Sequence, residues 1–209
     1  MKSQVSFDVG HWGLIVALEG PSGVGKSTLL AHLGVELSKA LVPHRLSSNN
    51  NVGSWGPIIR GLASNSAKPF TLALATAAAR AEMRESQSQT IVISDRYVLS
   101  SFVYQGYAGV PREELYNINS FLLRNAVTFV IDLDEAELAA RRNSRGSQES
   151  DWFKRSLTIK EEIELYRLAA ELLATRKHIV FHLDGRRPPG ELAAEVRDWV
   201  VANSAEVTQ

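Results

Sequence analysis

The feature that most constrains this chain is a glycine-rich segment, residues 20–28, that reads GPSGVGKST. It follows the apolar run LIVALE and precedes a segment with helical spacing, so the pattern GxxxxGK[ST] stands between a predicted strand and a predicted helix. Glycines let the backbone curl around phosphate groups with its N–H groups pointing inward, at the positive end of the helix. The segment therefore predicts a phosphate-binding loop and an α/β fold.

Each position of this loop is a candidate ATP-binding residue. Lys26 is expected to reach the β and γ phosphates, and the Ser27 hydroxyl is expected to be a ligand of Mg²⁺. A chance match in a glycine-rich turn is the competing interpretation, and the flanking strand and helix weigh against it. The predicted ATP-binding residues are Gly20, Pro21, Ser22, Gly23, Val24, Gly25, Lys26, Ser27 and Thr28.

Short apolar runs alternate with longer segments of helical spacing. The runs are mostly continuous, as in parallel strands that are buried on both faces, so the pattern predicts an α/β fold with helices on both sides of the sheet. The predicted strands are residues 14–18, 41–46, 90–94, 127–133 and 178–183. The predicted helices are residues 26–40, 70–88, 112–125, 135–142, 152–175 and 189–203, and the polar stretches 46–55 and 143–150 are predicted loops.

Composition limits the class of protein. The chain has 209 residues, 44% of them hydrophobic, without a shift in composition, so we expect a single domain over residues 1–209. Lys plus Arg and Asp plus Glu both total 23, which gives no electrostatic case for a nucleic acid or a membrane as partner. There is no cysteine, and residues 1–12 lack the apolar core of a signal peptide. We expect a soluble cytoplasmic protein whose residues 1–12 are flexible.

A second motif, TIVISDRY, ends a predicted buried strand with a carboxylate and an arginine. Ligands of α/β sheets bind at the carboxyl ends of the strands, so Asp95 is a candidate Mg²⁺ ligand and Arg96 a candidate clamp for an acceptor phosphate. A simple ion pair between the two is the alternative. The sequence lacks the DxxG and NKxD motifs of GTPases, and its five histidines are scattered, so no metal other than Mg²⁺ is indicated.

The segment DRYVLSSFVYQG, residues 95–106, closely resembles the DR[YH]xxSxxAYQG signature of thymidylate kinases. Further matches in the same order are AAARAE at residues 77–82, VID at 130–132, Arg145-Gly146, and RPPGEL at 187–192. The resemblance implies a P-loop kinase fold with five parallel strands in the order 2-3-1-4-5, an arginine-bearing lid at about residues 141–155, and a homodimer. It also implies ATP as the phosphate donor and Mg²⁺ as the cofactor.

The resemblance assigns the acceptor side of the site as well. Arg80 would point at the base, Arg96 at the acceptor phosphate, Tyr104 at the sugar and Gln105 near the base, with Ser100 in the same signature. The lid residues Arg141, Arg145 and Arg155 would close over the transferred phosphoryl group and exclude water, with Arg145 the first choice. Without the resemblance, a solvated helix end with basic residues at its negative terminus would be the favoured explanation of the basic run.

Several positions depart from the thymidylate kinase pattern. Ser22 replaces the usual acid of the loop, Thr76 replaces the base-stacking phenylalanine, and Trp152 replaces a lid arginine. The family's TREPG motif has no counterpart in residues 46–53. The sequence therefore predicts ATP-dependent phosphorylation of a nucleoside monophosphate, with dTMP as the leading acceptor. A P-loop kinase for another nucleotide, nucleoside or small metabolite, and a noncatalytic ATP-binding paralogue, are the alternatives.

Overall fold

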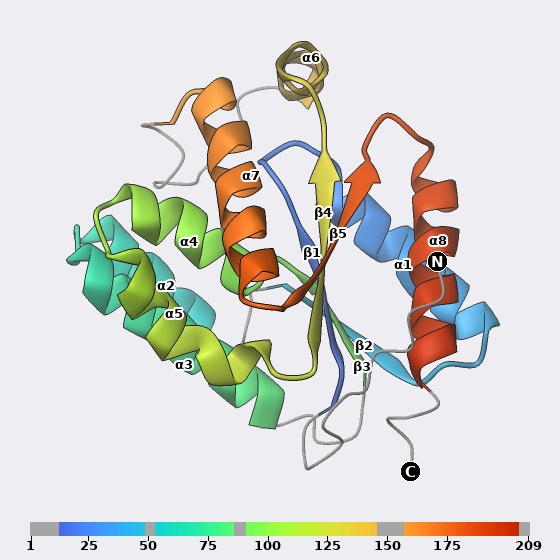
Figure 1. Ribbon diagram of the computed structural model, residues 1–209, viewed down its shortest axis with the longest axis horizontal. Coiled ribbons are helices and arrows are strands. Elements are labelled where there is room, and N and C mark those ends of the chain that lie inside the picture. The colour runs from blue at the N-terminus through green and yellow to red at the C-terminus, as the bar shows by residue number, and fades with distance from the viewer. Residues whose placement is uncertain (1–12, 49–52, 86–90, 146–156, 205–209) are drawn as a thin grey trace.

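A five-stranded parallel sheet forms the centre of the protein, in the order β2-β3-β1-β4-β5 (Figure 1). The order expected from the resemblance is therefore confirmed. The computed structural model describes residues 13–48, 53–85, 91–145 and 157–204. The strands are β1 (Ile15–Glu19), β2 (His44–Ser48), β3 (Ile91–Asp95), β4 (Ala126–Asp132) and β5 (Ile179–Asp184).

The helices lie in two layers, one on each side of the sheet. On one side α1 and α8 pack side by side against β1, β3 and β4, and on the other side lie α3, α4, α5 and α7 (Figure 1). The helices are α1 (Lys26–Lys39), α2 (Trp55–Ser64), α3 (Pro69–Glu85), α4 (Val98–Tyr107), α5 (Arg112–Asn119), α6 (Glu135–Arg145), α7 (Ile159–Thr175) and α8 (Pro189–Ser204). A 3₁₀ turn, Ser120–Leu123, leads from α5 into β4.

Burial explains why the central strands are continuous apolar runs. Every residue of β1 and β3 is buried, whereas the edge strands β2 and β5 are only partly covered. β2 begins at His44, later than predicted, because Pro43 lacks the N–H group that a strand pairing with β3 requires.

Two helices, α2 and α4, were not predicted from the sequence. Two stretches that were predicted to be loops are partly helix or strand. The stretch 46–55 contains the end of β2 and the first residue of α2, and α6 continues into the stretch 143–150 as far as Arg145. The sequence of α4, VLSSFVYQGY, carries no amphipathic pattern because its residues Val98–Gln105 are all buried, with α3 and α7 packed against the helix.

The ends of the other helices follow local signals. The predicted helix 112–125 ends as an α-helix at Asn119, and α7 begins at Ile159 behind a capping box formed by Thr158 and Glu161. Residues 1–12 and 152–156, which carried a predicted flexible segment and the start of a predicted helix, lie outside the described residues. Among the described helices, none is both long and apolar enough to cross a membrane.

Candidate nucleotide site

The phosphate loop joins β1 to α1 at the carboxyl edge of the sheet. Gly20 has φ +138°, and a Cβ atom there would lie 2.8 Å from the carbonyl oxygen of Ile131 in β4. Only glycine fits a left-handed backbone held this close to a neighbouring strand. Gly25, at φ +113°, is the N-cap of α1, so the backbone N–H groups of the first turn remain available for an anion.

Lys26 lies folded onto the loop that precedes it. Its Nζ atom donates to the carbonyl oxygens of Gly20 at 2.9 Å and Pro21 at 2.8 Å, and the residue is 6% exposed. Burial, followed by the nearby positive charge of Arg96, lowers the pKa of Lys26 to about 7. The amino group of Lys26 therefore lies beside the phosphate site, where a bound polyphosphate would favour its charged form.

Ser27 and Asp95 meet where α1 begins and β3 ends. The Ser27 hydroxyl donates to Asp95 Oδ2 at 2.7 Å. Both groups offer oxygen atoms, and Mg²⁺ in nucleotide sites is held by one or two such protein ligands together with substrate phosphates. The pair therefore fits the expected cation, although the described residues contain no cluster of three or more acidic, histidine or cysteine ligands.

Hydrogen bonds of both its backbone and its side chain hold Arg96 at the end of β3. Its φ of +71° is unusual for a residue with a side chain, and its backbone N–H donates to the carbonyl oxygen of Leu18 in β1. One guanidinium nitrogen, Nη1, donates to the hydroxyls of Tyr166 at 2.6 Å, Tyr104 at 3.0 Å and Ser100 at 3.3 Å. These hydrogen bonds fix the orientation of the Arg96 guanidinium before any ligand is bound.

Glu19 supports this arrangement from beneath. Its carboxylate is fully buried and accepts hydrogen bonds from the backbone N–H groups of Tyr97 at 2.7 Å and Ser100 at 3.1 Å. The other carboxylate oxygen accepts from the Ser100 hydroxyl at 2.6 Å. Glu19 therefore caps α4 and positions the signature segment. A carboxylate inside an apolar strand is the sequence signal that could have identified it.

A cavity of about 240 Å³ opens beside the phosphate loop. Arg141 of α6 spans it, donating to the carbonyl oxygens of Val24 at 3.1 Å and Gly185 at 2.9 Å. The lining of this cavity is largely apolar, and the Arg141 guanidinium forms part of it, which suits a flat aromatic base. The lining residues are Val24, Gly25, Thr28, Leu29, Ile131, Arg141, Gly185, Arg187, Pro189 and Leu192.

Comparison with known proteins places this chain in a family. The model of the family described as thymidylate kinase matches residues 18–196, which span the phosphate loop, the Asp95-Arg96 pair and α6. The chain belongs to the thymidylate kinase family.

Individual members of the thymidylate kinase family share about a third of their residues with this chain. A probable thymidylate kinase of Pyrobaculum calidifontis is 34% identical over 193 residues, which cover 88% of this chain and 93% of the relative. One of Pyrobaculum aerophilum is 35% identical over the same length, covering 88% and 95%. A thymidylate kinase of Xanthomonas oryzae pv. oryzae is 32% identical over 173 residues, covering 73% of each chain.

The remaining acceptor-side candidates lie on α3 and α4. Arg80 is 1% exposed and donates to Ser101 at 2.9 Å and to Asn119 at 3.1 Å, and burial lowers its pKa to about 10. Thr76, one turn earlier, donates to the carbonyl oxygen of Ala73 at 2.9 Å. Gln105 is buried near the end of α4.

The lid candidates are only partly described. Arg141 donates to the carbonyl oxygen of Val24 in the loop. Arg145 is the last residue of α6, and its side chain is not among those that the structure describes. Arg155 lies outside the described residues altogether. Two residues of α7 that sequence reasoning missed, Glu162 and Tyr166, reach the site from the other side.

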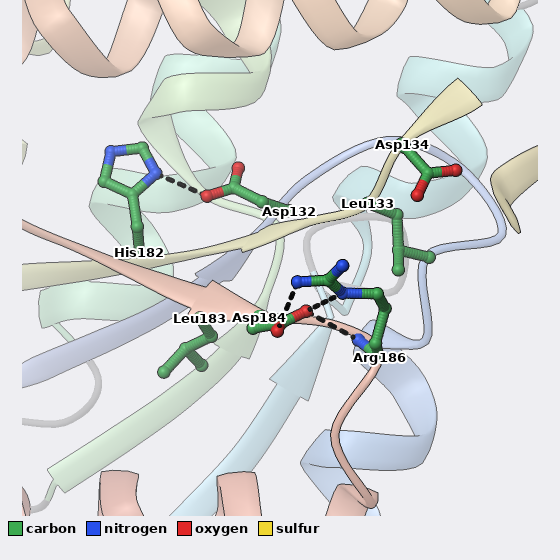
Figure 2. Close-up of a pocket in the computed structure, with 7 residues that line it drawn as sticks. All are labelled: Asp132, Leu133, Asp134, His182, Leu183, Asp184 and Arg186. Atoms are coloured by element: carbon green, nitrogen blue, oxygen red, sulfur yellow. Dashed lines mark hydrogen bonds and ion pairs between the residues drawn. The ribbon is translucent and has the colours of Figure 1, made fainter. Parts of the chain in front are cut away.

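A second cavity, of about 470 Å³, lies at the carboxyl ends of β4 and β5 (Figure 2). Asp184 accepts two hydrogen bonds from the Arg186 guanidinium, and His182 Nδ1 lies 2.7 Å from Asp132 Oδ2. The hydrogen bond to Asp132 raises the pKa of His182. Three carboxylates line this cavity, including that of Asp134, so it is poorly suited to phosphate.

Proposed function

We propose that the protein transfers the γ-phosphoryl group of ATP to dTMP, giving ADP and dTDP. The observation that carries this proposal is a pair of buried cations from two different elements, Lys26 of the phosphate loop and Arg96 at the end of β3. They are near enough for Arg96 to lower the pKa of Lys26. Because the second cation comes from a different element than the phosphate loop, it suits a phosphate carried by the acceptor.

Phosphoryl transfer requires alignment of donor and acceptor and positive charge around the transferred group. In our proposal Lys26 and the N–H groups of the loop hold the phosphates of ATP, and Arg96 holds the acceptor phosphate in line. Ser27 and Asp95 would hold Mg²⁺, which when bound neutralises charge on the β and γ phosphates. For Arg141, which was predicted as a lid residue over the phosphoryl group, we propose a different role, because it spans the cavity beside the loop and would cover the adenine there.

The lid roles remain proposals as well. Arg145 and Arg155 would contribute positive charge to the transferred phosphoryl group and exclude water. Support for Arg145 comes from its place at the end of α6, one turn beyond the arginine that contacts the loop.

The choice of dTMP as acceptor rests on family membership and on the residues around Arg96. Tyr104 and Ser100 lie within hydrogen-bonding distance of the Arg96 guanidinium, where an acceptor sugar would adjoin its phosphate. Arg80 and Gln105 are the proposed base contacts. A different acceptor base is the second candidate, because Thr76 carries no ring that could stack on thymine and its hydroxyl is engaged by its own helix.

Thermal stabilisation by ligands tests the proposed substrates, since a ligand that binds only the folded protein raises the melting temperature. ATP with Mg²⁺ and dTMP should each raise it, whereas dCMP, dGMP and thymidine at the same concentration should not. Thymidine is the informative control for Arg96, because it lacks only the phosphate. Equal stabilisation by thymidine and dTMP would remove the acceptor-phosphate role of Arg96.

A homodimer is proposed on the basis of exposed apolar side chains on α2 and α3. Ile58, Phe70 and Leu74 are between 42% and 48% exposed on neighbouring helices. A Leu74→Lys substitution should convert the dimer into a monomer, measured by sedimentation. A protein that sediments as a monomer without the substitution would contradict this proposal. A cytoplasmic location stays a prediction from the absence of cysteine.

A further inference from the structure

Glu162 of α7 is a buried carboxylate to which the proposed phosphate chemistry assigns no role. It is 2% exposed, although it lies on a helix whose other acids mostly face solvent. Leaving a charge in the interior is costly unless donors surround it. Its contacts therefore indicate what the residue does.

Three parts of the site donate to this one carboxylate. The backbone N–H of Ser22 in the phosphate loop donates to Oε1 at 2.9 Å, and the Tyr104 hydroxyl donates to the same oxygen at 2.7 Å. The guanidinium of Arg142 on α6 donates to Oε2. These donors keep the pKa of Glu162 below its ordinary value, although burial alone would raise it.

Arg142 also binds the carbonyl group of Ser22, the loop residue whose N–H group donates to Glu162. Its Nε atom donates to the carbonyl oxygen of Ser22 at 2.9 Å, while its Nη2 atom pairs with Glu162. The N–H and C=O groups of Ser22 are therefore both bound by one ion pair, made by α6 and α7. A Cβ atom at the next residue, Gly23, would lie 3.0 Å from Arg142 Cγ, so the side chain packs directly on the loop.

Tyr104 connects this ion pair to the acceptor side. Its hydroxyl accepts a hydrogen bond from Arg96 at 3.0 Å and donates its proton to Glu162. A continuous series of hydrogen bonds therefore runs from Arg96 through Tyr104 and Glu162 to the backbone of Ser22. Its two ends are the arginine assigned to the acceptor and the loop assigned to the donor.

We propose that Glu162 is a positioning residue that holds the phosphate loop and Arg96 in the relative placement that phosphoryl transfer requires. This inference rests on the proposed function, because it assumes that the loop and Arg96 each hold a phosphate. Transfer depends steeply on the alignment of the two reacting groups, so Glu162 should affect the rate of the chemical step more than the binding of either substrate.

Glu162→Gln is the direct test, because the two side chains have nearly the same volume. Its amide has one acceptor oxygen, and either orientation turns the NH₂ group toward a donor, Arg142 on one side or Ser22 and Tyr104 on the other. We expect kcat to fall by about 100-fold, with KM for ATP and for the acceptor changed by less than about threefold. Glu164→Gln is the matched control, an exposed position on the same helix that pairs with Arg167.

A double-mutant comparison separates positioning from simple stabilisation. If Glu162 and Arg142 act as one unit, Glu162→Gln combined with Arg142→Gln should be no slower than the slower single variant. The proposal would be overturned if the fold-loss in kcat of the double variant equalled the product of the two single losses. It would also be overturned if activity fell only in proportion to a lower melting temperature. A faster Glu162→Gln enzyme would also overturn it, because the contacts would then restrain the free protein. Arg142→Gln provides the same test should Glu162→Gln not fold.

Amide hydrogen exchange gives a measurement that does not depend on turnover. The Ser22 N–H, bound to a buried carboxylate, should exchange on the order of tenfold faster in Glu162→Ala, which removes both acceptor oxygens, and at an unchanged rate in Glu164→Ala. Turnover of dTMP by the unaltered enzyme is measured first. Its absence would count against the proposed acceptor alone, while unchanged Ser22 exchange in Glu162→Ala would count against the positioning role alone.

Discussion

The hydroxyl of Ser27 lies 2.7 Å from Asp95 Oδ2, which joins the first turn of α1 to the carboxyl end of β3. The two residues are 68 positions apart in the chain, yet their oxygens meet because β1 and β3 are adjacent parallel strands. Leu18, two residues before the loop, is paired with Asp95 itself. The sheet register therefore builds the proposed cation site.

This pair predicts how the enzyme responds to Mg²⁺. Asp95→Asn should raise the Mg²⁺ concentration needed for half-maximal turnover and lower kcat on the order of 100-fold, since a charged ligand becomes a neutral one. A Mg²⁺ titration at saturating ATP measures both. Asp198→Asn, an exposed aspartate on α8, is the control. An unchanged Mg²⁺ requirement in Asp95→Asn would exclude the assigned role.

Lys26 predicts a proton uptake when ATP binds. With its pKa lowered to about 7, the free protein holds Lys26 mostly deprotonated at about pH 8. The phosphates of ATP favour the charged form, so binding at that pH should take up a fraction of a proton approaching one. Calorimetry in two buffers of different ionisation enthalpy measures this number, and Lys26→Ala should abolish it. The same uptake in Lys26→Ala would contradict the assignment.

Substitution of Glu19, which lies outside the phosphate loop, should lower the stability of the fold. Glu19→Ala leaves the N–H groups of Tyr97 and Ser100 without their buried acceptor, which should cost about 3 kcal/mol of unfolding free energy. Urea denaturation measures the difference. Glu114→Ala, an exposed acid in the first turn of α5, should change stability by less than about 0.5 kcal/mol. Equal effects of the two substitutions would refute the capping role.

The pair of His182 and Asp132 in the second cavity predicts a pH dependence of stability. Because the folded state raises the pKa of His182, the pair stabilises the fold fully below the unfolded pKa of about 6.5 and loses that contribution as the pH rises through the folded pKa. Asp132→Asn should therefore lower the melting temperature more at about pH 5.5 than at about pH 8. An equal change at both pH values would contradict the sign of this coupling.

The order of the sheet could be predicted only through the resemblance to thymidylate kinases, whereas the meeting of the phosphate loop with Asp95 could be predicted from local signals. The loop, Lys26, Ser27 and Asp95 lie in short motifs next to strands, and parallel strands bring such ends to one edge. Glu162 and Tyr166 could not be predicted in this way. They lie on α7 at positions four apart, and only the packing of that helix against α4 brings Tyr166 to Arg96 and Glu162 to Tyr104.

The helix α4 illustrates a second limit. Its residues Val98–Gln105 are all buried, so a stretch with two valines and a phenylalanine gives no helical period to detect. What sets its start is Glu19, a residue nearly 80 positions away in the chain, through its hydrogen bonds to Tyr97 and Ser100. Contacts of this range are absent from any local sequence pattern.

Transfer of phosphate from ATP to dTMP is the central claim, and the direct measurement is product formation with ATP, Mg²⁺ and single acceptors. The account predicts ADP and dTDP in equal amounts with dTMP, identified by mass, at a rate far above the release of ADP without acceptor. It also predicts no transfer to thymidine, which offers Arg96 no phosphate. ADP release that dTMP leaves unchanged, or transfer to another acceptor in preference to dTMP, would contradict it.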